Sequence, residues 1–230
     1  MARLDVRKGR GFRIVEAGAA AVGGLAVAGG VALATYPRWR PWCITWGATD
    51  DEVGSRLPGD DLVADPDLVT TRAISIAAPA DAVWPWLVQM GPDRGGVYTY
   101  DWIENLLGLG VHSVDEVVPE FQNLQIGDAQ HLGESGPVVR AAVVHPDEAM
   151  VLESDDGRWS WAFVLVENDA GTRLISRNRI TLPKDTAVTR WFYTYGMEPG
   201  SLIMERKMLL GIKERAERLA GARSSEPVAA

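Results

Sequence analysis

Aromatic and acidic side chains alternate in one short stretch, GGVYTYDWIENLLG, at residues 95–108. Its carboxylates, Asp101 and Glu104, are three residues apart and would share one face of a helix. In a cavity mouth such a pair can act as general acid and base. At the start of a surface helix it would instead be solvated and stabilised by the helix dipole. Because ionised carboxylates are mostly exposed, we expect the solvated arrangement.

Three aromatic residues, Tyr98, Tyr100 and Trp102, accompany these carboxylates. The glycines before them permit a sharp turn. The rings either pack in a corner of the core or line the mouth of a pocket, with their polar tips toward a ligand. The spacing fits both arrangements, and both are kept open.

The histidines lack the pattern of a metal site, because His112, His131 and His145 are far apart in the sequence. No HExxH, phosphate-loop or nucleophile-elbow motif is present. His112 precedes two acidic residues and could transfer protons, but a hydrogen-bonded structural histidine explains it equally well. We therefore predict no metal, no cofactor and no assigned catalytic residue.

The composition and net charge limit the kinds of molecule that the protein is expected to bind. The 230-residue chain carries a net charge of −8, with 47% hydrophobic and 23% charged residues. This balance is typical of a folded globular protein. An acidic surface repels nucleic acid, so we expect no nucleic-acid partner. Cys43 is the single cysteine, which excludes an intramolecular disulfide.

Residues 14–35 form an apolar run with one charged residue, Glu16. About 20 apolar residues suffice for a membrane-spanning helix. Basic residues are concentrated before the run, which predicts a single-pass anchor with its N-terminus inside and the following domain extracytoplasmic. The alternatives are a signal peptide cleaved near residues 32–34, with a secreted domain, and a soluble helix on a cytoplasmic protein.

Changes in composition divide the rest of the chain. Residues 1–45 hold the basic segment and the predicted anchor. Residues 46–68 are rich in Gly, Pro and Asp and are expected to form a connector. The main domain is expected at residues 69–221, followed by a disordered tail at residues 222–230.

Hydrophobic periodicity predicts the elements of the main domain. Residues 69–78 alternate as a strand, and Pro79 opens a short helix that contains Pro85. A second short helix is expected at residues 100–107, and Ser201 is expected to cap a long helix that ends near Ala220. Between them the pattern predicts strands at residues 126–132, 138–145, 149–154, 158–167 and 172–182. Their short connections indicate an antiparallel meander.

These elements predict an α+β fold. A curved antiparallel sheet of six to seven strands would surround a long C-terminal helix, with two short helices after the first strand and an N-terminal apolar helix in addition. One helix cannot cover a whole sheet of that width. We therefore expect a cavity between the sheet and the terminal helix.

Several motifs resemble one bacterial branch of the START-like (SRPBCC) superfamily. They are ISIAAPADAVWPWLVQMG, GGVYTYDWIENLLG, HSVDEVVPEFQNLQIGD and WSWAFVLVE, and they follow the same order over residues 46–218. The resemblance implies the helix-grip fold that birch-pollen-allergen-like and polyketide-cyclase-like proteins share. It also implies an apolar ligand such as a lipid, sterol or polyketide. Some branches catalyse cyclisation, dehydration or hydrolysis, but no catalytic residue is carried over.

Candidate ligand contacts are aromatic, methionine and histidine residues, since adaptable apolar side chains line most pockets. The predicted contacts are Tyr98, Tyr100, Trp102, His112, Trp161, Trp191, Met204 and Met208. Residues 173, 177 and 179 are arginines on one face of a strand, and we expect that face to point away from the helix. An inward Arg177 would instead indicate an anionic group on the ligand.

Three functions fit the sequence. The first is binding of a hydrophobic small molecule or lipid, for transport or sequestration, by a domain tethered to the membrane through residues 14–35. The second is an enzyme of the cyclase, dehydratase or hydrolase type, with protons handled at the cavity mouth by Tyr98, Tyr100, Asp101, Glu104 or His112. The third is a structural or partner-binding role. The sequence does not indicate an oligomeric state.

Overall fold

The computed structural model describes residues 30, 34–106, 112–131, 137–183 and 186–225. The chain forms two compact units, residues 1–41 and 42–230. In the first unit, residues 34–41 are helical, and the rings of Tyr36 and Trp39 meet edge to face at 4.4 Å. Most of the predicted apolar helix of residues 14–35 lies outside the described residues. None of the helices that are described is long and apolar enough to cross a membrane.

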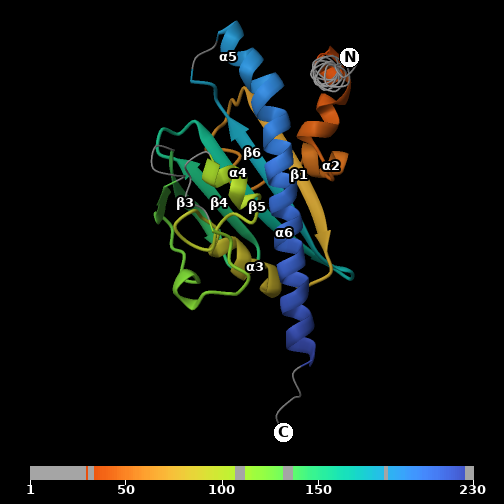
Figure 1. The fold of residues 1–230 in the computed structure, drawn as a ribbon, viewed down its shortest axis with the longest axis vertical. Coiled ribbons are helices and arrows are strands. Elements are labelled where there is room, and N and C mark those ends of the chain that lie inside the picture. Colours follow the sequence, from red (N-terminus) through yellow and green to blue (C-terminus); the bar gives the residue numbers. More distant parts are fainter. Residues whose placement is uncertain (1–29, 31–33, 107–111, 132–136, 184–185, 226–230) are drawn as a thin grey trace, which may run out of the picture. The chain divides into compact units, whose positions relative to one another are not determined.

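Six antiparallel strands form one sheet in the second unit, in the order β1–β6–β5–β4–β3–β2 (Figure 1). Their bounds are β1 Leu68–Ile76, β2 Ala129–His131, β3 Val138–His145, β4 Ala149–Ser154, β5 Trp159–Asn168 and β6 Gly171–Ile180. The predicted meander is confirmed, and β3 and β4 have the predicted bounds. The strand predicted at residues 126–132 is reduced to three residues. The first strand pairs with the last along its whole length.

The helices largely follow the predicted order. Their bounds are α2 Asp50–Gly54, α3 Ala80–Val88, α4 Asp101–Leu106, η1 Pro119–Phe121, α5 Ala187–Phe192, η2 Tyr193–Met197 and α6 Glu198–Ser225. The two short helices after β1 are thus α3, which contains Pro85, and α4. With the six-stranded sheet and the long terminal helix, they confirm the helix-grip arrangement. α6 continues beyond the predicted end near Ala220, and residues 226–230 lie outside the described part of the chain.

The prediction that Ser201 caps the terminal helix is wrong. α5, η2 and α6 follow one another without a break over residues 187–225. Pro199 has no amide hydrogen to continue an α-helical ladder. The turn before it is a π-helix, in which the Glu198 amide donates to the Tyr193 carbonyl, five residues back. The wider turn carries the helix through a proline that usually ends one.

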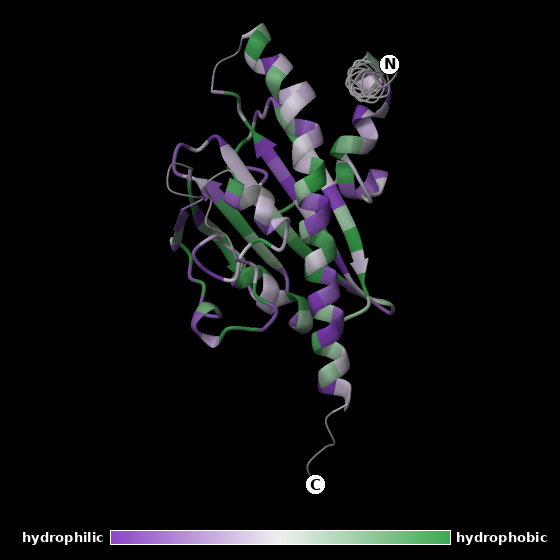
Figure 2. Cartoon of the chain, viewed as in Figure 1, coloured by the Kyte–Doolittle hydropathy of each residue, from purple (hydrophilic) through white to green (hydrophobic). Residues whose placement is uncertain are grey.

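α6 packs against α3 and one face of the sheet, and its hydrophobic and hydrophilic residues alternate along the rod (Figure 2). Buried side chains from these three layers form a contiguous core. Examples are Val83 and Leu87 of α3, Phe163 of β5, and Leu209 and Ile212 of α6. This core lies beside α6 from Met208 onward, while the residues of α6 before Met208 face a different environment that is described below.

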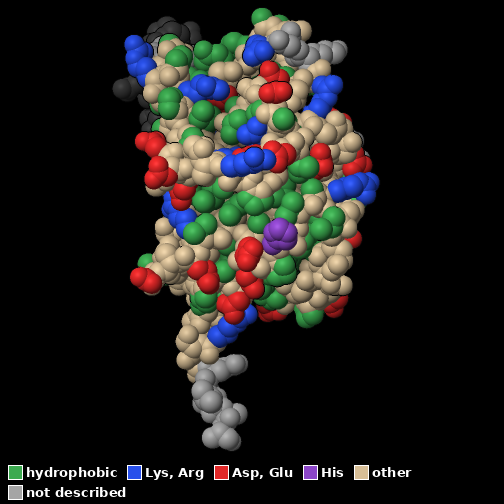
Figure 3. Space-filling model, turned by 180° about the vertical axis from the view of Figure 1, so that it is seen from behind, with side chains coloured by type: hydrophobic (Ala, Val, Ile, Leu, Met, Phe, Trp, Pro, Cys, Tyr) green, Lys and Arg blue, Asp and Glu red, His purple; other side chains and the backbone are tan. Residues whose placement is uncertain are grey.

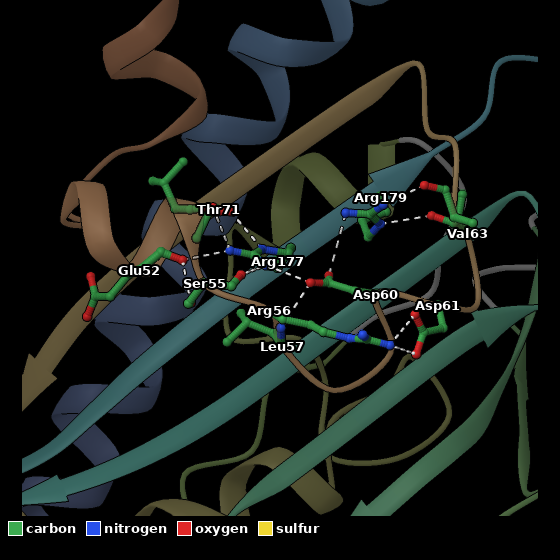
Figure 4. Close-up of polar contacts among 12 residues, drawn as sticks. Glu52, Ser55, Arg56, Leu57, Asp60, Asp61, Val63, Thr71, Arg177 and Arg179 are labelled. Carbon is green, nitrogen blue, oxygen red and sulfur yellow. Dashed lines mark hydrogen bonds and ion pairs between the residues drawn. The ribbon is translucent and has the colours of Figure 1, made fainter.

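The opposite face of the sheet is covered by the connector, as Figure 4 shows. α2 opens with a capping box, in which the Thr49 hydroxyl accepts from the Glu52 amide and the Glu52 carboxylate accepts from the Thr49 amide. Glu52 also pairs with Arg173 of β6, at 2.7 Å between Oε1 and Nε. The hydrogen bond from Arg173 lowers the pKa of Glu52, although partial burial opposes the shift.

Arg177 holds the end of α2 against the sheet. Its guanidinium donates to the main-chain oxygens of Glu52, Val53 and Ser55 at 2.6–3.0 Å and to Asp60 Oδ2 at 2.9 Å. Only 3% of Arg177 is exposed. The prediction that this arginine face points away from the terminal helix is confirmed, and the connector rather than solvent covers it.

Arg179 continues this arrangement by donating to the carbonyls of Val63 and Ala64. Seen from behind, basic side chains on this side of the molecule lie beside acidic ones (Figure 3). Around the connector, Glu52 pairs with Arg173, and Asp60 pairs with Arg177 and Arg179.

Candidate functional site

One buried ion pair joins the first strand to the terminal helix. Arg72 Nη1 of β1 donates to Glu205 Oε2 of α6, and 0% of the Arg72 side chain and 5% of the Glu205 side chain are exposed. Arg72 also donates to Ser201 Oγ at 3.0 Å and to the Cys43 carbonyl at 3.2 Å. Burial raises the pKa of Glu205, against the opposing attraction of Arg72. Such a pair is costly to desolvate and needs further hydrogen bonds.

Neighbouring strands supply those bonds. Ser176 Oγ of β6 donates to Glu205 Oε1 at 2.6 Å, and Asn178 Nδ2 lies 3.4 Å from Oε2. The indole of Trp161 donates to Ser176 Oγ and that of Trp159 to Asn178 Oδ1, both at 2.9 Å. We call the whole set the interior polar cluster: Arg72, Trp159, Trp161, Ser176, Asn178, Ser201 and Glu205.

A free hydroxyl group borders this cluster. Thr70 lies opposite Asn178 in the sheet, and Asn178 lies opposite Trp161. Because strand side chains alternate, Thr70 points to the same face as Arg72. It is 3% exposed, and its Oγ1 has no hydrogen-bond partner within the described part of the chain. A buried hydroxyl without a partner costs free energy and calls for an explanation.

An aromatic row lies beside the polar groups. The rings of Trp159 and Trp161 stack at 5.7 Å between centroids, and those of Trp161 and Phe163 lie 4.8 Å apart. Both tryptophans are half-buried, whereas Phe163 is fully buried. The row therefore extends from half-buried tryptophans that contact solvent to a phenylalanine in the core. Together with Thr70, it gives the site one apolar wall and one polar end.

The predicted aromatic corner is distinct from this site. Tyr98 is buried, with a positive φ of 57°. Its amide donates to Ser113 Oγ, and Ser113 in turn donates to both carboxylate oxygens of Asp101. Arg215 lies 4.8 Å over the Tyr98 ring, and burial raises the pKa of this tyrosine to about 12. Here Asp101 fixes the backbone, and its carboxylate is engaged in doing so.

The remaining predicted contacts are dispersed. Trp161 belongs to the interior polar cluster, Met208 is buried in the core and Met204 is half-buried beside Glu205. Trp102 and Trp191 are 68% and 58% exposed. His112 is also exposed, with Nδ1 4.0 Å from Asp101, and Tyr100 is half-buried. The side chain of Glu104 lies outside what the structure describes. The structure therefore brings only part of the predicted set near the cluster.

Sequence reasoning missed Arg72, Glu205 and Thr70. A signal was available for Arg72, the only charge in its strand, whereas Glu205 is one of three consecutive charged residues, with Arg206 and Lys207, in the first half of the terminal helix. Nothing in the local pattern marked the hydroxyl of Thr70.

A surface depression of about 470 Å³ lies elsewhere, at the end of α6 remote from the cluster. It is open and lined by residues 77–79 and 167–171, and it is not the interior cavity that the sequence predicts. Among the described residues, no group of three His, Cys, Asp or Glu side chains is placed to hold a metal ion.

Comparison with solved structures gives distant similarities. No protein-family model matches the chain, and no curated protein matches it. Among solved structures, a Mesorhizobium loti protein is 15% identical, covers 69% of this chain and 99% of its own, and has a TM-score of 0.38. A polyketide-cyclase-like protein from Corynebacterium glutamicum is 17% identical, with coverage of 68% and 91% and a TM-score of 0.33.

An AHSA1-like protein from Aeromonas hydrophila is 14% identical, with coverage of 71% and 99% and a TM-score of 0.34. At such distances, the matches assign no ligand or reaction to this chain. The helix-grip arrangement follows from its own sheet order and terminal helix, and the site is argued from its own side chains.

Proposed function

We propose that this domain binds a largely apolar small molecule that carries an uncharged polar group. The apolar body would lie along Trp159 and Trp161, and a hydroxyl or carbonyl oxygen would meet Thr70 and Asn178. The observation that carries the proposal is the buried, unpartnered Oγ1 of Thr70 beside half-buried aromatic rings. A ligand oxygen there would satisfy a group that the protein leaves unpaired.

The preference for an uncharged ligand comes from the ion pair. Arg72 and Glu205 neutralise each other, and each nitrogen of the guanidinium already has a protein partner. No uncompensated charge remains to attract an ionic ligand. A ligand ion would have to be desolvated beside a neutral site, which is strongly unfavourable.

The proposed setting is a membrane. Residues 14–35 would tether the domain, with the domain on the extracytoplasmic side, and lipids or lipid-like molecules would be the accessible ligands. The domain would carry or sequester such a molecule. This part of the proposal is supported by the apolar run in the sequence and by the positions of the basic residues before it.

Binding is tested with matched threonine variants. Native mass spectrometry of the full chain in mild detergent would detect a retained ligand, and tryptophan fluorescence would follow titration with a sterol and with a long-chain alcohol. Thr70→Val should weaken binding about 5- to 30-fold, since one hydrogen bond contributes roughly 1–2 kcal/mol. Because the hydroxyl it removes is unpaired, this variant should be as stable as the unsubstituted protein.

Thr172→Val is the control. Thr172 is equally buried, but its hydroxyl donates to the Ala78 carbonyl at 2.7 Å. It should lose about 1 kcal/mol of unfolding free energy and leave binding unchanged. Equal affinity of the Thr70→Val variant and the unsubstituted protein for both titrants, or no retained or titratable apolar molecule, would overturn the proposal.

An enzymatic alternative rests on Glu205, whose pKa is raised by burial. A carboxyl group in such surroundings can serve as a general acid. Its oxygens, however, are already engaged by Arg72 and Ser176. If Glu205→Gln retained ligand binding but blocked conversion of a bound molecule in mass spectrometry, the enzymatic alternative would replace simple binding.

A further inference from the structure

The helix before the terminal rod exposes an apolar stripe. Val188, Trp191 and Phe192 are 77%, 58% and 51% exposed, and Tyr195 continues their spacing of three and four residues. Such spacing places side chains on one face of a helix. The rings of Trp191 and Tyr195 lie 5.8 Å apart. Met197 and Ile203, near the start of α6, are also 46% and 56% exposed.

The polypeptide enters the second unit at the same end of the domain. The unit starts at Trp42, which is 56% exposed. The next residue, Cys43, places its Sγ 3.5 Å from the carbonyl of Glu198, the first residue of α6. η2 and α5 directly precede Glu198 in the chain. The apolar stripe and the entry point therefore belong to one end of the domain.

We propose that this end, with Trp42 and the stripe of α5, rests on a lipid bilayer. The inference goes beyond the proposed ligand binding and rests on the anchor predicted at residues 14–35. Six residues, 36–41, separate that segment from Trp42, and even fully extended they reach at most about 22 Å. An anchored domain must therefore keep this end close to the membrane.

The composition of the stripe suits the membrane interface. Tryptophan and other aromatic rings prefer the boundary between headgroups and acyl chains. A helix that presents them on one face, with polar residues such as Thr189 and Arg190 between them, can lie in that boundary. Contact with the bilayer would remove from water the apolar side chains that α5 exposes.

Bilayer contact would also bring the ligand site close to the membrane. Arg72 bonds both Cys43 and Ser201, so the interior polar cluster lies in the half of the domain that would face the lipid. Its half-buried tryptophans would then be near the source of an apolar ligand. A short path from bilayer to site would spare such a ligand exposure to water.

The test uses the full chain in phosphatidylcholine vesicles. In a Cys43→Ser background, an environment-sensitive fluorophore is attached to Val188→Cys or, as the control, to Asn168→Cys. Asn168 is exposed and closes β5 at the hairpin that lines the remote depression. Both variants carry the same anchor, so a difference between them reports contact of the domain with the bilayer.

We expect a blue-shifted emission at position 188 and several-fold stronger quenching by spin-labelled lipid than at position 168. Trp191→Ser combined with Phe192→Ser should reduce that quenching, whereas Thr70→Val should leave it unchanged. Equal, weak quenching at both positions overturns the inference. A blue shift without lipid quenching also overturns it, because the stripe would then be covered by a second copy of the chain. None of these outcomes depends on ligand binding.

Discussion

Both faces of the sheet bury arginine, but the partners differ. On the connector side, Arg177 donates mostly to main-chain carbonyls of a single short segment. On the helix side, Arg72 meets a carboxylate and a hydroxyl from α6, and the cluster extends to side chains of two further strands. Only the second arrangement borders half-buried rings and an unpartnered hydroxyl.

The difference shows what burial of a charge can signify. Carbonyl acceptors fix the position of a backbone, so Arg177 has an architectural role. Side-chain groups close to partly solvated rings can exchange partners with a ligand, so the surroundings of Arg72 suit binding. Burial of a charged side chain, taken alone, would indicate a functional site equally on both faces of the sheet.

The largest expected effect is at the helix side. Arg72→Met leaves Glu205 buried without its counter-charge, which should lower the free energy of unfolding by about 3–5 kcal/mol in urea titrations. Combining it with Glu205→Met should restore much of that loss, since an apolar pair of similar volume needs no desolvation of charge. A double variant less stable than Arg72→Met would contradict this account of the pair.

The second-largest effect is expected on the connector side of the sheet. Arg177→Met removes four donated bonds to the connector and should lower stability by about 2–3 kcal/mol, without changing ligand affinity. Arg140→Met is the control, because the Arg140–Asp155 pair is half-exposed and should contribute much less to stability. Weakened binding in Arg177→Met would show that the two faces are coupled.

A smaller effect is expected where the connector touches the sheet. Gly59 has a φ of 86°, and a Cβ there would lie 2.5 Å from Cγ1 of Val151. Gly59→Ala should therefore lose about 1–2 kcal/mol for the backbone conformation, plus a packing term. Gly157→Ala has a similar φ of 67° with open space around it, so thermal unfolding should show the smaller loss. Equal losses would mean that the contact with Val151 is loose.

The smallest effect is a pH dependence at Glu52. Its pKa is lowered in the folded protein by Arg173, so its ionised form stabilises the fold above the ordinary value of 4.5. That contribution is lost as the pH falls from 4.5 through the lower folded pKa. Glu52→Gln should flatten the acid limb of the stability curve by less than about 1 kcal/mol. An unchanged acid limb would show that the Arg173 contact contributes nothing.

The sequence predicted the elements that local patterns define. β3 and β4 have clear boundaries because alternating residues are closed by short turns. The start of the terminal helix was misjudged because Pro199 and Gly200 usually interrupt a helix, whereas here a π-turn accommodates the proline. The reason for the error is local backbone geometry, which residue types alone do not specify.

The site was harder to predict than the fold. Arg72 and Glu205 are 133 residues apart, and their contact exists only once β1 and α6 are packed. Likewise, the residue types of the connector predicted turns, but they did not predict which face of the sheet the connector covers. The aromatic and acidic composition of residues 95–108 suggested a cavity mouth. In the structure, however, Tyr98 is buried and Asp101 is hydrogen-bonded to Ser113.

The pairing of β1 with β6 has a consequence for biosynthesis. Ile76 lies opposite Thr172, so nearly a hundred residues must be made before the first strand finds its neighbour. Closing so long a loop is slow and entropically unfavourable. The nascent domain therefore stays open until β6 has been translated, and a chain truncated before residue 171 would leave β1 as an unprotected edge that invites aggregation.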